Sequence, residues 1–112
     1  MGTDITAVSA VTGVPLAWFL MVSAVLFCLG LIGVLTRRNV LVIFMSAELM
    51  MNAVNLALIA FSASLNSMAG QNFVVFVVTI AAAEAAVGLA IIIALVRRRP
   101  TVDTTDLDIL RE

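Results

Sequence analysis

Three long apolar stretches alternate with short polar segments, and this pattern predicts three helices that each cross a membrane. The stretches cover about residues 15–35, 40–61 and 73–96. Each is long enough for roughly 30 Å of hydrocarbon, which takes about 20 helical residues. Pro15 suits the first turn of a helix. We therefore predict an all-α membrane protein, a single transmembrane unit over residues 1–112.

The segments outside these stretches are short and polar. Residues 36–39 hold Arg37 and Arg38, while residues 62–72 are uncharged and contain Gly70, which favours a turn. The end of the chain, 100–112, is acidic and has little to bury, so we expect a surface tail there. The start of the chain, 1–14, holds Asp4 and no basic residue, unlike a secretory signal peptide. We therefore expect the first apolar segment to remain in the mature protein.

The arginines predict an orientation. All but one of them lie at 37–38 or at 97–99, and three crossings place these two sites on the same side of the membrane. The positive-inside rule assigns that side to the cytoplasm. We therefore expect the N-terminus outside and the C-terminus in the cytoplasm.

Composition argues against several classes of function. The chain is 63% hydrophobic and 12% charged, with a formal net charge of −1, so nothing indicates a nucleic-acid partner. A single cysteine, Cys28, and no histidine leave no basis for a disulfide framework or a transition-metal site. Three helices of this length bury little surface against one another. We therefore expect the chain to be one piece of a larger membrane assembly.

Glu48 and Glu84 each lie alone near the middle of an apolar stretch. A charged residue at the centre of a bilayer costs about 2.5–3.5 kcal/mol on insertion scales, so such residues usually have a function. Counted from the cytoplasmic ends of their helices, Glu48 lies about 12 Å deep and Glu84 about 18 Å deep, a difference of about 6 Å. We expect the two carboxyls to transfer protons. The alternative is that both are neutral, hydrogen-bonded links between helices.

The surroundings of the two glutamates differ. Asn52 and Asn55 share a helical stripe with Glu48, where their amides would hold its carboxyl or a water molecule. They would equally serve as interhelical hydrogen-bonding groups, and both interpretations stay open. Glu84 is surrounded by alanines that favour close packing, with Gly88 one turn away.

Arg37 and Arg38 have two interpretations. The simpler is that they fix the topology at the membrane face. The second is electrostatic, since either side chain could extend toward Glu48 or a partner subunit.

Two motifs carry a family resemblance. AELMMNAVNL at 47–56 and AAAEAAVGLAI at 81–91 lie within the longer runs 35–62 and 70–98. These runs resemble the second and third helices of the K subunit of NADH-quinone oxidoreductase, respiratory complex I. The likeness covers about residues 19–98 and shows no departure at either glutamate or at the paired arginines.

The resemblance implies a place in the membrane arm of a proton-pumping enzyme in the bacterial cytoplasmic membrane. Glu48 and Glu84 would then belong to a hydrophilic axis between the quinone site and antiporter-like subunits, and Arg37 and Arg38 would match the family's basic pair. It implies no cofactor in this chain. NADH, FMN, iron–sulfur clusters and quinone would bind other subunits, and the partners would be the bilayer and other membrane-arm subunits.

Two alternatives stay open. The C subunit of multisubunit sodium/proton antiporters is similar in size and span count, but that family has a proline-containing stretch leading into its third helix. Here the corresponding stretch is GQNFVVFVV, without proline. The other alternative is a purely structural subunit that stabilises its neighbours and moves no protons.

Overall fold

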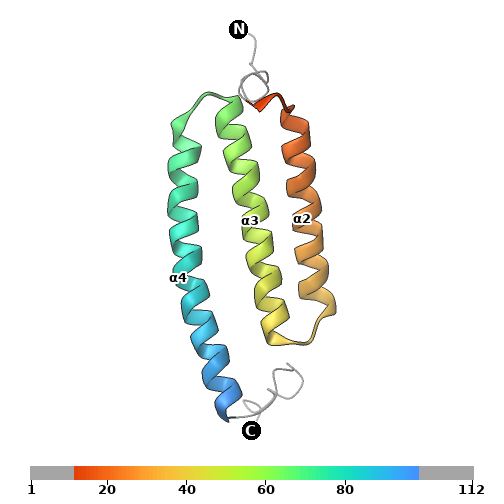
Figure 1. Cartoon of the computed structure of the whole chain (residues 1–112), viewed down its shortest axis with the longest axis vertical. Coiled ribbons are helices and arrows are strands. Elements are labelled where there is room, and N and C mark those ends of the chain that lie inside the picture. Colours follow the sequence, from red (N-terminus) through yellow and green to blue (C-terminus); the bar gives the residue numbers. More distant parts are fainter. Residues whose placement is uncertain (1–11, 99–112) are drawn as a thin grey trace.

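The computed structural model describes residues 12–98, which form three long helices (Figure 1). They are α2 (Leu16–Thr36), α3 (Val40–Ser64) and α4 (Met68–Arg98). All three are long and apolar enough to cross a membrane, and no strand occurs between residues 12 and 98. The predicted three-span, all-helical class is therefore confirmed. The predicted N-terminal segment up to residue 11 and the tail at 100–112 lie outside the described residues.

The connection between the last two helices is shorter than predicted. α3 continues to Ser64 and α4 begins at Met68, although the polar composition predicted a loop over 62–72. Hydrogen bonds allow the tight turn, because the Ser62 hydroxyl donates to the Ser67 carbonyl and Asn66 adopts a φ of 48°. Asparagine tolerates this left-handed conformation better than most residues. Polar residues of this segment are therefore part of α3 and α4, because the helices satisfy the hydrogen bonds of their backbone groups.

The connection between α2 and α3 is closed by local hydrogen bonds. The Arg37 N–H donates to the Gly33 carbonyl and ends α2. Asn39 caps α3, since its side-chain oxygen accepts from the N–H groups of Leu41 at 2.9 Å and Val42 at 3.4 Å. A capping asparagine satisfies N–H groups that the first helical turn leaves free. The paired arginines thus lie in a defined turn at the end of the helices.

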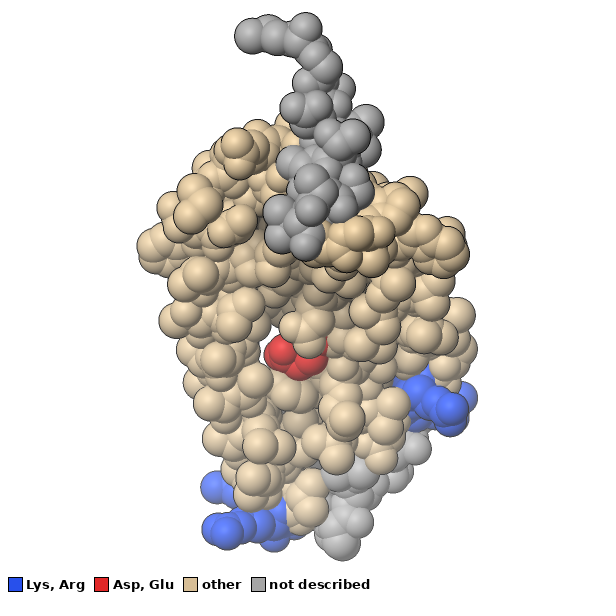
Figure 2. Space-filling view, turned by 45° about the horizontal axis from the view of Figure 1, so that its top comes forward, with Lys and Arg blue, Asp and Glu red and all other residues tan. Residues whose placement is uncertain are grey.

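α3 is the central helix and packs against both α2 and α4, more extensively against α2 (Figure 1). The α2–α3 connection and the end of α4 lie at the same end of the molecule, as three crossings require. The arginine side chains, drawn blue in Figure 2, accordingly gather toward that end. The side of the membrane on which this end lies stays a prediction.

The contact between α2 and α3 depends on small residues. A Cβ added at Gly30 would lie 2.5 Å from Met50 Cγ and 2.8 Å from the Ser46 carbonyl oxygen. Two turns further along, the buried Ser23 hydroxyl donates to the Ala53 carbonyl at 2.5 Å, and Ala53 is completely buried. Small residues let helix backbones approach closely in a membrane, where packing drives helix association. The two helices therefore form a tight pair.

Large apolar side chains cover the outside of the three helices. Leu35, Met45 and Phe76 are all exposed, Leu35 by 74% and Phe76 by 70%. The buried side chains within residues 12–98 are few and include both small and large ones: Ala53, Ala60, Ser23, Ser62, Asn55, Leu16, Val74 and Ile92. Such a surface is suited to lipid or to other membrane subunits rather than to water.

Candidate functional site

Two close contacts determine the register between α3 and α4. A Cβ added at Gly88 would lie 2.5 Å from Phe44 Cε2 and 2.9 Å from Phe44 Cζ. Near the other end of the pair, a Cβ at Gly70 would lie 2.7 Å from Ser62 Cβ. The helices are antiparallel, so residue numbers increase along α3 in the direction in which they decrease along α4. The two contacts lie far apart along the pair, and both give the same register between the helices.

This register places Glu48 and Glu84 at nearly the same level. Glu48 lies one helical turn after Phe44, and Glu84 lies one turn before Gly88. Because the helices are antiparallel, both glutamates lie one turn from the Phe44–Gly88 contact on the same side of it. The expected difference of about 6 Å in depth was therefore wrong. It assumed that α3 and α4 reach the same depth at their arginine ends. Instead α4 continues about six residues, or about 9 Å, beyond the level of Val40, where α3 begins.

The two carboxyls differ in exposure. Glu48 is half-buried, whereas Glu84 is exposed on the subunit surface. Neither has a hydrogen-bond or ion-pair partner among residues 12–98. Figure 2 shows the acidic surface, drawn red, in a hollow at mid-length, apart from the arginines drawn blue toward one end. Because an unpaired carboxylate is costly at this depth, both groups call for polar partners or water from outside the chain.

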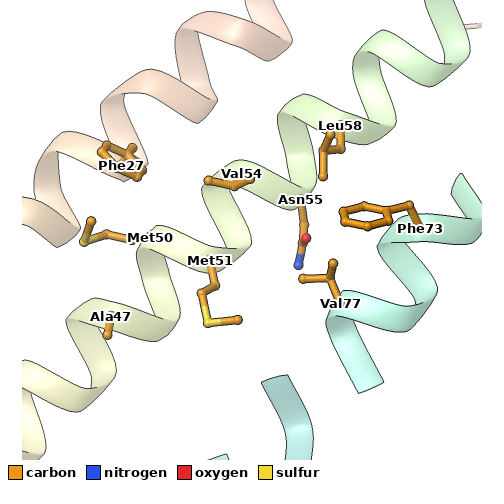
Figure 3. Close-up of a pocket in the computed structure, with 9 residues that line it drawn as sticks. All are labelled: Phe27, Ala47, Met50, Met51, Val54, Asn55, Leu58, Phe73 and Val77. Atoms are coloured by element: carbon orange, nitrogen blue, oxygen red, sulfur yellow. The ribbon is translucent and has the colours of Figure 1, made fainter. Parts of the chain in front are cut away.

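The two asparagines of the predicted stripe have different environments. Asn55 is buried, 5% exposed, and faces α4 near Phe73 and Val77 (Figure 3). Its side-chain oxygen has no hydrogen-bond partner. Asn52 is exposed, and no hydrogen bond joins either amide to Glu48. The sequence thus predicted the shared side of α3 but not the burial of Asn55.

Arg37 and Arg38 are exposed and form no ion pair within the described part of the chain. They lie about three helical turns before Glu48. Arg97 and Arg98 are in the last turn of α4, where a positive charge complements the helix dipole. Their placement fits anchoring at the membrane face. No contact between an arginine and a glutamate occurs within residues 12–98.

A pocket of about 380 Å³ on α3 was not predicted from the sequence. It lies between α2, α3 and α4, and apart from Asn55 its lining is apolar (Figure 3). The residues that line it are Phe27, Ala47, Met50, Met51, Val54, Asn55, Leu58, Phe73 and Val77. Glu48 and Glu84 do not line it. The described residues contain no group of three or more side chains suited to hold a metal ion.

Comparison with known proteins agrees with this architecture. A family model described as NADH-ubiquinone/plastoquinone oxidoreductase chain 4L matches residues 18–112. The NADH-quinone oxidoreductase subunit K of Thermomicrobium roseum is 61% identical over 94 residues, which cover 84% of this chain and 92% of that protein. The chain belongs to the subunit K family of NADH-quinone oxidoreductases.

Further members of the subunit K family are similarly close. The subunit K of Deinococcus radiodurans is 54% identical over 98 residues, which cover 88% of this chain and 95% of that protein. That of Roseiflexus castenholzii is 50% identical over 98 residues, covering 88% of this chain and 98% of that protein. The resemblance identified from the two glutamate motifs is thus confirmed. Membership makes the chain a multi-pass membrane subunit of an NADH-quinone oxidoreductase.

Proposed function

We propose that this subunit K transfers protons between two carboxyls, Glu48 and Glu84, within the membrane arm of a proton-pumping NADH-quinone oxidoreductase. The transfer couples quinone chemistry in one part of the complex to antiporter-like subunits in another. NADH, FMN, iron–sulfur clusters and quinone bind other subunits. This chain contributes the carboxyls and the helices that position them.

The register between α3 and α4 is the observation that carries this proposal. It sets two carboxyls at nearly one depth on neighbouring helices, rather than a turn apart. Groups at one depth exchange a proton directly or through one or two waters without moving it toward either membrane face.

The different exposure of the two carboxyls supports a proton path that leads outward from this chain. Glu48 is half-buried beside α4, and Glu84 faces the surroundings of the subunit. In an assembled complex the exposed carboxyl therefore meets a neighbouring subunit. Glu84 is then the group that exchanges protons with that neighbour, and Glu48 is the inner group.

The alternatives have less support. The relatives described above are named as subunit K of NADH-quinone oxidoreductase rather than as antiporter subunits. A purely structural subunit would use both carboxyls as hydrogen-bonding links between its own helices. Neither carboxyl has such a partner within residues 12–98.

We further propose a location in the bacterial cytoplasmic membrane, with the arginine end toward the cytoplasm. Cysteines placed at Leu65, in the turn between α3 and α4, and at Thr105 test this orientation. The natural Cys28 is first replaced by serine. With an impermeant thiol reagent, intact cells should label the first site and inverted vesicles the second. Labelling of both sites from one side would contradict the three-span orientation.

Single substitutions test the proton-transfer role in the assembled complex. Glutamine keeps the size and most of the hydrogen bonding of glutamate but exchanges no proton, so Glu48→Gln should greatly lower coupled quinone reductase activity. Glu84→Gln should give a similar or smaller loss. Glu48→Asp and Glu84→Asp keep the acid, and water bridges part of the lost reach, so activity should be partly retained. A structural role predicts instead that glutamine is tolerated at both positions.

Thr79→Val serves as a control for these substitutions. It removes another polar group from α4, one whose hydroxyl donates to the Val75 carbonyl at 2.8 Å within the same helix. Coupled activity should stay near the unmodified level. A loss equal to that of Glu84→Gln would show that the assay responds to any loss of polarity on α4.

A further inference from the structure

The ring of Phe44 packs directly on the backbone of α4, one helical turn from the level of the two carboxyls. A Cβ added at Gly88 would lie 2.5, 2.9 and 3.3 Å from the ring atoms Cε2, Cζ and Cδ2. A space too small for one methyl carbon has no room for a water molecule either. The contact lies on the arginine side of Glu48 and Glu84, because α3 begins and α4 ends on that side.

Glu48 lies on the same side of α3 as this ring. At about 100° per residue, Phe44 and Asn55 lie within about 20° of each other around α3, and Glu48 lies within about 40° of both. Phe44 contacts α4 and Asn55 faces α4 (Figure 3), so Glu48 is on the α4 side as well. Residues four apart on a helix are neighbours. Phe44 is therefore the side chain next to Glu48 toward the arginine end.

The rest of the α3–α4 pair toward the arginines is apolar. Residues 40–44 of α3 and 88–96 of α4 contain no polar side chain. Ile92, one turn beyond Gly88, is buried, and the register places it level with Val40 at the start of α3. Buried water needs two to four polar partners, and apolar spaces stay dry. Water therefore has neither space nor partners between Glu48 and the arginine end of this helix pair.

The other side of the carboxyl pair is different. The pocket of about 380 Å³ begins at Ala47, beside Glu48 in the sequence, and extends along α3 to Leu58 (Figure 3). On α4 it reaches Val77 and Phe73, which are farther from the arginines than Glu84 is. The two carboxyls thus have a closed contact on their arginine side and open space on their other side.

We propose that Phe44 closes the path between α3 and α4 from the arginine side of the membrane to Glu48. The ring excludes water from this path, so Glu48 exchanges protons with Glu84 and not with the arginine side through the helix pair. A carboxyl with permanent access to that side could not retain a proton against a gradient. This inference rests on the proposed proton transfer by Glu48, and it gives Phe44 a role beyond packing.

Deletion of the ring tests the closure in purified complex reconstituted in vesicles. Phe44→Ala should lower the protons translocated per NADH oxidised by about twofold or more, while NADH oxidation per assembled complex continues. Phe44→Leu keeps a bulky apolar side chain and should retain most of the ratio. The matched control is Phe61→Ala, which deletes a ring from α3 about 20 Å from Glu48 on its other side. A packing role for Phe44 predicts less assembled complex with an unchanged ratio.

A normal ratio with Phe44→Ala would overturn the proposal. So would an equal fall with Phe61→Ala, or a leucine variant no better than alanine. If the alanine variant does not assemble, Phe44→Val carries the same test, with a smaller fall expected because part of the side chain remains.

Glu48→Gln separates failure of this inference from failure of the proposed function. If Glu48→Gln stops pumping and Phe44→Ala keeps a normal ratio, closure by Phe44 is wrong and proton transfer by Glu48 stands. If Glu48→Gln pumps normally, proton transfer by Glu48 is wrong, and the role of Phe44 in guarding it is wrong as well.

Discussion

The two helix interfaces of this small subunit are built differently. Between α2 and α3, Gly30 faces a backbone carbonyl, and Ser23 donates a hydrogen bond across to the Ala53 carbonyl. Between α3 and α4, Gly88 faces the ring of a side chain, Phe44. The second interface is less extensive and lies beside a half-buried carboxyl. Near the turn the α3–α4 pair is also close, at Gly70, but towards the other end of the pair its glycine meets a ring, whereas the glycine between α2 and α3 meets a backbone carbonyl.

This difference indicates that the α2–α3 pair and α4 have different roles. α2 and α3 form a rigid support, because small residues and a direct hydrogen bond determine how closely they pack. Two glycine contacts align α4 with α3 and so set the level of its exposed glutamate. Polar groups without partners, Asn55 and both glutamates, lie on or beside the α3–α4 pair. A membrane protein keeps such groups where other subunits or water complete them.

Adding one methyl group to each interface tests whether the two interfaces differ in rigidity. Gly30→Ala places a carbon 2.8 Å from the Ser46 carbonyl oxygen, which cannot move without its helix. Overpacking of this kind costs about 1–3 kcal/mol, so assembled complex should fall severalfold. Gly88→Ala meets the far end of the Phe44 ring, which can rotate away, and should reduce assembly much less. Native gel analysis of membranes measures both. Equal losses, or a larger loss for Gly88→Ala, would show that the interfaces do not differ in rigidity.

A smaller effect is expected at Asn52, which is exposed beside Glu48. If its amide holds a water or the carboxyl, Asn52→Leu should lower proton pumping by at most about tenfold, the value of one hydrogen bond of ~1.4 kcal/mol, with assembly retained. If it serves as a link to a neighbouring helix, the same change should mainly reduce assembled complex. Pumping and assembly measured on one preparation separate the two roles. If neither changes, Asn52 has no part in either.

The smallest effect is expected at Ser23. Its hydroxyl bond to the Ala53 carbonyl is worth about 0.6 kcal/mol, the average for polar links between membrane helices. Ser23→Ala should therefore lower the thermal stability of the assembled complex slightly and leave proton pumping unchanged. Heating detergent-solubilised complex and following its residual activity measures this. A loss of pumping in the intact complex would show that the α2–α3 pair takes part in proton transfer after all.

Much of the fold could be predicted from the sequence. The length of the three apolar runs predicts three crossings, because membrane thickness determines helix length. The limits of α3 and α4 near Ser62 and Gly70 could not be predicted. Polar composition favours a loop there, whereas side-chain hydrogen bonds and a single positive φ at Asn66 allow a much shorter turn.

The candidate site was predicted in part. Isolation in apolar surroundings is enough to single out Glu48 and Glu84. Their relative depth depends on how far α4 continues past the start of α3, and no composition encodes that register. The sequence places Gly88 one turn from Glu84, but it does not encode the contact with Phe44 through which this glycine helps to determine the register. The burial of Asn55 likewise depends on which side of α3 is covered by α4.

Proton pumping by the double variant Glu48→Gln, Glu84→Gln in assembled complex tests proton transfer through the two carboxyls directly. Glutamine removes the cost of ionisation at both positions, so assembly should be normal or better. Reconstituted in vesicles and supplied with NADH and quinone, the variant should lose most coupled activity and proton translocation, while electron transfer to an artificial acceptor continues. Normal coupled activity and normal pumping by the double variant would contradict proton transfer through these two carboxyls.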